Sequence, residues 1–251
     1  SKGTTTIENV TVTSKVSGVY ICQLTSTGAE VVNVESGTFI SGEYGVYIAN
    51  PKGSTTKSPV ETLNINGGTI NGTHTGVYAK GAESGSRNAV VNVNITAGTV
   101  SSVGVYGAKE EQPVNLTVSG GTISDKLHID NLGGKALVTG GAVKGAVTNS
   151  GTLTISGGTF NGDLTNKTNG SITITGGTFA IKPDTTYLAE GYTITENADG
   201  TYGIKKTTYV AEVNGTQYIS LQAAIKAAGR NATVKLLADT RENVTISTPY
   251  L

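Results

Sequence analysis

The sequence predicts an all-β fold: a parallel β-helix solenoid of about 7–8 coils, followed by hairpins and one short α-helix that opens a second module. Two observations predict it. The first is the composition, which has 35 Gly, 14% charged residues and no Met or Trp, and this suits many short strands joined by tight turns. The second is a strand motif that ends in Gly-Gly-Thr or a close variant, followed by a large apolar residue, and recurs along the chain.

The copies of this motif define the repeat. They read "VNVESGTF", "LNINGGTI", "VNITAGTV", "LTVSGGTI", "LVTGGAV", "LTISGGTF" and "ITITGGTF". Their second glycines are Gly37, Gly68, Gly98, Gly121, Gly141, Gly158 and Gly177, so the intervals are 31, 30, 23, 20, 17 and 19 residues. An interval that varies but does not fall below a minimum length, here 17 residues, is typical of a solenoid coil that tolerates insertions. A propeller blade needs roughly 40 residues.

Alternation within the repeat predicts the core. In "TLTISGGTF", Leu153 and Ile155 share one face of a strand and Thr152 and Thr154 share the other. The same pattern places five further pairs inside: Val32/Val34, Leu63/Ile65, Val93/Ile95, Leu116/Val118 and Ile172/Ile174. After each glycine corner, a second internal stack is expected from Phe39, Ile70, Val100, Ile123, Val143, Phe160 and Phe179.

The pattern changes near Pro183, which predicts three parts: a parallel β-helix over 1–182, a closing β-hairpin over 183–206, and a truncated hairpin-helix-strand start of a following module over 207–251. Turn residues 197–200 and Asn214-Gly215 indicate the two hairpins. "SLQAAIKAAG" predicts the helix, with Ser220 as N-cap and Gly229 as its stop. "ATVKLLAD" and "ENVTIS" predict strands.

The "SGGTF" repeats, over about residues 5–180, resemble the right-handed, pectate-lyase-like parallel β-helix repeats of large cell-surface proteins of Gram-positive gut bacteria. The tail "YLAEGYTITENADGTYGIKK" and the residues after it are similar to the junction between tandem modules of such proteins. The resemblance implies an extracellular, wall-attached chain on the bacterial cell surface, and it implies architecture and location more than chemistry. The first residues and the ending "ISTPYL" are typical of a segment of a longer protein.

Composition excludes several function classes. Lys plus Arg and Asp plus Glu number 18 each, and no basic run forms a phosphate-binding stripe, so nucleic acid is not an expected partner. Cys22 is the one cysteine, so neither an intrachain disulfide nor a cysteine-based metal site is expected, and we predict a small core residue. No apolar run approaches the ~18 residues of a membrane span, and no motif predicts a metal or cofactor.

An enzyme of the β-helix class would need carboxylates close together. The six aspartates are scattered, and the nearest cluster is Asp125, His128 and Asp130 in "SDKLHID". Leu127 and Ile129 are expected inside, which turns His128 outward and favours a solvated strand edge, although weak activity there stays open. No pectinase-type sequence occurs, and His74 lies in a polar insertion where it is expected to be exposed.

The tripeptide Gly-Val-Tyr occurs four times and contributes Tyr20, Tyr47, Tyr78 and Tyr106. In later coils Leu127, Val147 and Leu164 are the expected counterparts of Val46, Val77 and Val105, so His128, Thr148 and Thr165 take the tyrosine position. A position that holds tyrosine, histidine and threonine in different coils is more readily exposed than buried, which favours outward tyrosines. The expected inward pairs Val19/Ile21 and Val46/Ile48 favour the same orientation. An internal tyrosine stack is the alternative.

Outward tyrosines would form an exposed ladder beside the insertions "IANPKGSTTKSPVE", "AKGAESGSRNAVV" and "GAKEEQP". Flat aromatic rings beside polar loops suit a glycan or a host surface protein. Asn149 and Asn166, 17 residues apart, are expected to stack one coil apart in a structural role.

We therefore expect a non-catalytic extracellular module, a structural spacer or adhesin that presents the ladder as a binding face. One alternative is a carbohydrate-active enzyme, either a polysaccharide lyase or a glycoside hydrolase. A second is ice binding through outward pairs such as Thr152/Thr154 and Thr173/Thr175, although Asn64/Asn66 and Asn92/Asn94 break that array. End-to-end self-association of solenoids is also open.

Overall fold

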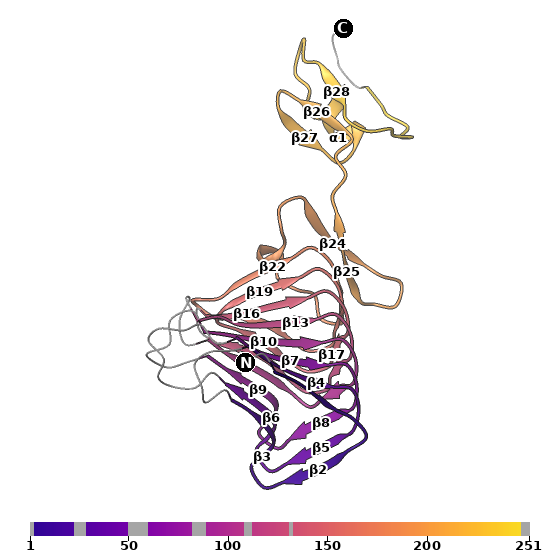
Figure 1. Cartoon of the computed structure of the whole chain (residues 1–251). Helices are drawn as coiled ribbons and strands as arrows, with labels where there is room; N and C mark the ends of the chain where they lie inside the picture. Colours follow the sequence, from indigo (N-terminus) through magenta and orange to yellow (C-terminus); the bar gives the residue numbers. More distant parts are fainter. Residues whose placement is uncertain are drawn as a thin grey trace. The chain divides into compact units, whose positions relative to one another are not determined.

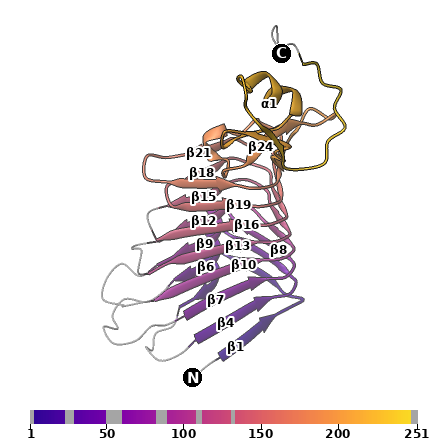
Figure 2. The ribbon, with the colours of Figure 1, turned by 90° about the horizontal axis from the view of Figure 1, so that it is seen from above.

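The computed structural model describes residues 3–22, 29–49, 60–81, 89–107, 112–130 and 133–246. Within them, the first part of the chain runs through three parallel sheets in turn, and each coil except the last contributes one strand to each sheet (Figure 1). Figure 2 shows successive strands of the first sheet lying side by side. The chain therefore forms an all-β parallel solenoid.

The strands are short. The first sheet contains β1 (Gly3–Ile7), β4 (Ala29–Val34), β7 (Val60–Ile65), β10 (Val90–Ile95), β13 (Val114–Val118), β16 (Gly134–Val138), β19 (Thr152–Ile155) and β22 (Ser171–Ile174). The second begins with β2 (Thr11–Ser14), β5 (Thr38–Ser41), β8 (Thr69–Gly72), β11 (Thr99–Val100), β14 (Thr122–Ile123), β17 (Ala142–Val143), β20 (Thr159–Phe160) and β23 (Thr178–Phe179). The third contains β3 (Ser17–Ile21), β6 (Tyr44–Ala49), β9 (Thr75–Lys80), β12 (Val103–Tyr106), β15 (Leu127–Asp130), β18 (Val147–Asn149) and β21 (Leu164–Asn166).

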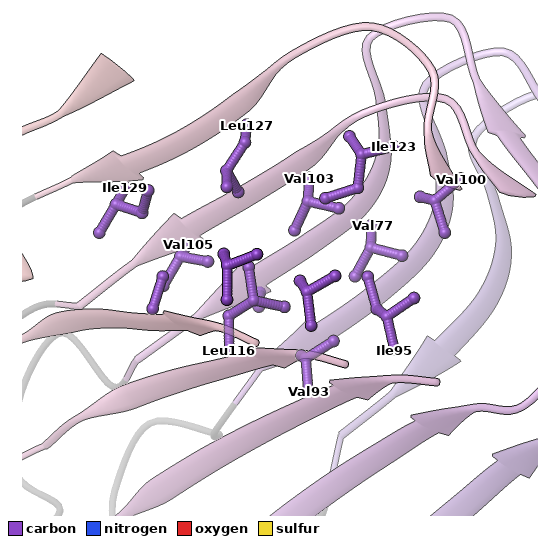
Figure 3. Packing of buried hydrophobic residues seen from close by; sticks show 14 of the residues in the cluster. Val77, Val93, Ile95, Val100, Val103, Val105, Leu116, Ile123, Leu127 and Ile129 are labelled. Atoms are coloured by element: carbon purple, nitrogen blue, oxygen red, sulfur yellow. The ribbon is translucent and has the colours of Figure 1, made fainter. Parts of the chain in front are cut away.

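The core lies between the three sheets, where apolar side chains of all of them meet. Figure 3 shows Val93 and Ile95 of the first sheet, Val100 of the second and Val103 of the third pointing toward one another. Every residue predicted for the two internal stacks is buried, from Val32 to Phe179. Residues of like kind thus cover one another from coil to coil, and this burial drives folding of coils that could not be stable alone.

The bend between the first and second sheets depends on glycine. The second glycine of all seven motifs has a positive φ, from 71° at Gly121 to 112° at Gly37. A side chain at Gly121 would in addition place Cβ 2.8 Å from the carbonyl oxygen of Ala97, one coil earlier. Only glycine fits both the backbone conformation and this close approach, which explains why the motif keeps it.

Asparagines stack along the outside of the first sheet. The Nδ2 of Asn64 donates to Oδ1 of Asn33 at 2.8 Å, and Nδ2 of Asn94 donates to Oδ1 of Asn64 at 2.8 Å. These residues are register partners in consecutive coils. Asn64 and Asn94, which interrupt the outward threonine pairs in the sequence, thus belong to a hydrogen-bonded ladder that the sequence did not predict.

Two strands follow the solenoid within residues 183–206, the range in which a closing hairpin was predicted. β24 (Tyr192–Glu196) and β25 (Tyr202–Lys206) extend the second sheet, and β25 pairs antiparallel with β23. The short helix η1 (Thr185–Tyr187) precedes them. Tyr187, Leu188, Tyr202 and Ile204 pack against the core, so these elements cover its last coil.

The chain divides into two compact units, residues 1–189 with 194–204, and residues 190–193 with 205–251. In the second unit β26 (Ala211–Val213) pairs with β27 (Thr216–Tyr218) and β28 (Val234–Leu236), and α1 (Leu221–Ala227) packs beside them. The turn at Asn214-Gly215 has the two positive φ angles of a tight hairpin, 49° and 83°. Oγ of Ser220 accepts from the N–H of Ala223 at 3.1 Å, as predicted for the N-cap, and α1 ends at Ala227, two residues before Gly229.

The prediction of a strand in "ENVTIS" is wrong within its described residues, 242–246. Instead, the Glu242 carboxylate accepts from the N–H groups of Leu221 and Gln222, the closest at 2.9 Å. Those N–H groups at the start of a helix have no intrahelical partner, so a carboxylate satisfies them better than a strand pairing would. The hydrogen bond from Leu221 holds the pKa of Glu242 below its ordinary value.

Candidate functional site

Tyrosines of the third sheet form a stacked column on its outer surface. Tyr20, Tyr47 and Tyr78 are register partners on β3, β6 and β9. Their ring centroids lie 4.9 and 5.1 Å apart, with interplanar angles of 13° and 17°. Tyr20 is 62% exposed, whereas the neighbouring Val46 and Val77 are fully buried. The outward orientation is therefore confirmed, and the alternative of an internal tyrosine stack is wrong.

The register predicted for the fourth tripeptide is wrong by two residues. Val103, not Val105, pairs with Val77 and Leu127, so Gly104 lies opposite Tyr78 and His128. The reason is a shorter turn: Val103 follows Val100 by three residues, whereas Val77 follows Ile70 by seven. A shift of two residues preserves the alternation of a strand, so the side chain of Tyr106 still points outward.

Tyr106 nevertheless joins the column, because Gly104 leaves room for its ring. A Cβ at Gly104 would lie 2.5 Å from Cε2 of Tyr106, so the ring covers that glycine. It stacks on Tyr78 at 4.5 Å and 25° and meets His128 at 5.5 Å. In the two coils that follow His128, Thr148 and Thr165 occupy the same register position, as predicted. We call Tyr20, Tyr47, Tyr78, Tyr106 and His128 the aromatic ladder.

A second aromatic row, which sequence reasoning missed, flanks the ladder. Tyr44 contacts the rings of Tyr47 at 5.4 Å, Tyr78 at 4.7 Å and His74 at 5.5 Å. His74 is exposed, as expected, but it also belongs to this cluster. Alternation gave no signal for Tyr44, because it stands three residues before Tyr47 and a regular strand directs residues at that spacing to opposite faces.

The stacking decides what the ladder offers to a ligand. Because rings 4.5–5.1 Å apart cover one another, the faces of Tyr47 and Tyr78 are occupied by neighbouring rings. The ladder therefore presents ring edges and hydroxyls, rather than the flat faces that the sequence suggested. Among the described rings, none covers the outer face of Tyr20.

Burial raises the pKa of hydroxyls in the ladder. Desolvation, and to a lesser degree the neighbouring tyrosines, raise the pKa of Tyr78 to about 12, although the ammonium group of Lys80 opposes this. Burial and the carboxylate of Asp130 raise the pKa of Tyr106. Both phenols are therefore hydrogen-bond donors at neutral pH.

We expect Tyr78 to ionise near pH 12, well above the ordinary value of 10.0. The stabilisation by neutral Tyr78 is thus complete below pH 10 and is lost as the pH rises toward about 12. Tyrosinate absorbance against pH measures this, with Tyr78→Phe removing the late-titrating component and Tyr218→Phe as the control for one lost phenol. If Tyr78→Phe instead removes a component that titrates near 10, the burial argument is wrong.

The ladder ends at a pocket of about 290 Å³. Residues of successive coils line it: His74, Thr75, Tyr106, Lys126, Leu127, His128, Ala146 and Thr148. Nδ1 of His74 and Oγ1 of Thr75 lie 3.1 Å apart, which orients that imidazole. The lining combines two histidines, one lysine and three hydroxyls with the apolar side chains of Leu127 and Ala146, and this mixture suits binding of a ligand with both polar and apolar surface.

The predicted cluster of Asp125, His128 and Asp130 is brought only partly to this pocket. His128 lines it, with Leu127 and Ile129 buried on either side. Asp125 lies on an exposed bend, where its N–H donates to the carbonyl oxygen of Ser101 at 2.7 Å. Neither carboxylate is among the residues that line the pocket.

Metal and membrane features are absent from the part of the chain that the structure describes. No group of three or more His, Cys, Asp or Glu side chains there could hold a metal ion. No helix there is long and apolar enough to cross a membrane. Cys22 is half-buried rather than a core residue as predicted, and burial raises the pKa of its thiol. The predicted insertions lie mostly outside the described residues, at 50–59, 82–88 and 108–111.

A threonine column on the second sheet also escaped sequence reasoning. Thr11, Thr38, Thr69, Thr99, Thr122, Thr159 and Thr178 occupy one position in eight consecutive strands, interrupted by Ala142. The outward position two residues on is mixed, with Ile40, Asn71 and Lys144 among its members. This single column differs from the outward pairs Thr152/Thr154 and Thr173/Thr175, on which the ice-binding alternative rested.

No family model, curated protein or solved structure matches this chain.

Proposed function

We propose that this chain is a non-catalytic extracellular module of a bacterial surface protein, a rigid right-handed parallel β-helix spacer that binds a glycan. The observation that carries the proposal is the pocket at the end of the aromatic ladder. The outer face of the first sheet, by contrast, includes the asparagine ladder, whose side chains bond to one another. The third sheet carries the aromatic cluster and its pocket instead.

The geometry suits a sugar. A volume of about 290 Å³ is at the lower end of the range for small-molecule sites, and the pocket opens beside ring edges and hydroxyls. The hydroxyls of Tyr106 and Thr148 and the imidazole of His128 can bond to sugar hydroxyls. Since stacked rings and strand-borne side chains are already fixed, little conformational entropy is lost on binding.

The carbohydrate-active alternative has less support from the same pocket. Retaining and inverting glycosidases flank the scissile bond with two carboxyl groups about 5–9.5 Å apart. The described lining holds no carboxylate, and Asp125 and Asp130 lie outside it. Binding without bond cleavage is therefore the function that we propose.

The test is a glycan array followed by calorimetry on the chain 1–251. Ala146 is exposed and lines the pocket, so Ala146→Leu adds bulk there without a charge change. We expect at least a tenfold loss of affinity, because a branched side chain excludes ligand atoms from the site. The matched control is Ala180→Leu, at an exposed alanine that follows β23. Absence of any bound glycan would refute the function, and equal binding by both variants would refute the pocket.

A further inference from the structure

We propose that the pocket selects glycans that carry an anionic group, a carboxylate or a sulfate ester, which Lys126 binds. This inference rests on the proposed function and names its ligand class. Lys126 is the one formally charged side chain in the described lining, which otherwise contributes imidazoles and hydroxyls. All of these groups can donate hydrogen bonds, and none of the lining side chains is an anion that would repel the ligand.

The backbone that holds Lys126 is fixed by its neighbours. Its carbonyl oxygen accepts from the N–H of Val103 at 3.0 Å, and the next N–H, of Leu127, donates to Ala146 at 3.0 Å. Leu127 is fully buried. Lys126 therefore lies on a bend between β14 and β15 that is hydrogen-bonded to the preceding and following coils, and its flexible side chain starts from a fixed point at the pocket.

Two further donors have a defined orientation. His74 uses Nδ1 in its contact with Thr75, so Nε2 is the nitrogen available to a ligand. The ring of Tyr106 is held between Tyr78 and His128. A phenol is protonated at neutral pH, so the Tyr106 hydroxyl donates a hydrogen bond and does not repel an anion.

The acidic residues nearby limit the kind of anion. Asp125 precedes Lys126, and Asp130 lies close enough to raise the pKa of Tyr106. These carboxylates offset the positive charge of Lys126 at longer distances from the pocket, so the surface does not attract polyanions in general. The geometry thus favours a sugar with an isolated anionic group that reaches Lys126 directly.

Three oligosaccharides of one backbone and length test the inference: neutral dextran, carboxymethyl-dextran and dextran sulfate, each with about one substituent per chain. Calorimetry at physiological ionic strength should show at least tenfold tighter binding of one or both charged forms, and the two forms separate a carboxylate from a sulfate preference. Lys126→Gln should remove an affinity advantage of the charged over the neutral form of about tenfold to hundredfold, since a bond to a charged group is lost. Lys144→Gln, at the exposed lysine that follows β17, is the matched control and should retain this advantage.

The outcomes separate the two proposals. If neutral glycans bind with Ala146→Leu sensitivity and the charged forms gain nothing, the anionic preference is refuted while the glycan-binding function stands. Retention of the preference in Lys126→Gln, or its equal loss in Lys144→Gln, also refutes the role of Lys126. If no glycan of any charge binds, both proposals fail.

Discussion

Replacing Phe160 by alanine lowers the free energy of unfolding of the solenoid by about 3–5 kcal/mol, the usual cost of removing a buried aromatic ring. Phe160 is 1% exposed, and its ring lies 4.9 Å from that of Phe179 at an interplanar angle of 11°. The substitution removes both the buried apolar area and this ring contact. The cavity cannot close, because parallel pairing with strands on both sides holds β20 in place.

Urea denaturation followed by circular dichroism measures this loss. Because repeat arrays unfold in parts, hydrogen exchange of β17, β20 and β23 should show it locally. Ile40→Ala on the same sheet is the control, since Ile40 is 49% exposed and its truncation should cost less than about 0.5 kcal/mol. A change below about 1 kcal/mol for Phe160→Ala would mean that the apolar column is not the main source of stability.

Asn149→Ala is expected to cost about 2–4 kcal/mol, because it leaves the buried N–H and carbonyl oxygen of Gly151 without the Asn149 side chain and removes its bonds to Asn166 and Ser171. The side chain of Asn149 is fully buried. Its Nδ2 lies 3.1 Å from the carbonyl oxygen of Gly151, 2.8 Å from Oδ1 of Asn166 and 3.1 Å from the carbonyl oxygen of Ser171. Its Oδ1 accepts from the N–H of Gly151 at 3.2 Å, so one side chain satisfies the turn before β19.

Asn161→Ala is the matched control, since Asn161 is an exposed asparagine of the same solenoid. Thermal and urea unfolding of both variants should differ by the cost of the lost buried bonds. Equal stability of the two variants would contradict a structural role for Asn149. The sequence predicted that role and the stack with Asn166, and the bond between them supports it.

Much of the fold was predictable because its signals are local. Leu153 and Ile155 alternate with threonines, which places them in the core without knowledge of any distant residue, and both are fully buried. The positive φ of Gly121 and the hairpin turn at Asn214-Gly215 are likewise properties of a few adjacent residues. The strand predicted in "ENVTIS" failed because Glu242 caps a helix twenty-one residues earlier in the chain, a contact that no local pattern contains.

The sequence predicted which way the side chains of the site point, but not which residues make up the site. Outward alternation correctly placed Tyr20, Tyr47 and Tyr78 on one surface. It did not show that their rings cover one another, nor that Tyr44 and His74 join them. The pocket combines residues from separate coils, and variable turns between those coils hide their alignment.

Tyr106 shows where the two kinds of information separate. The sequence by itself determined that its side chain leaves the core, because alternation along a strand is set by the residues on either side. Only the tertiary structure decided that Tyr106 is displaced by two residues and that its ring fills the space over Gly104 to reach Tyr78 and His128. Whether a side chain points into or away from the core is set by the local backbone. Which residues of other coils it contacts depends on the length of every turn between those coils.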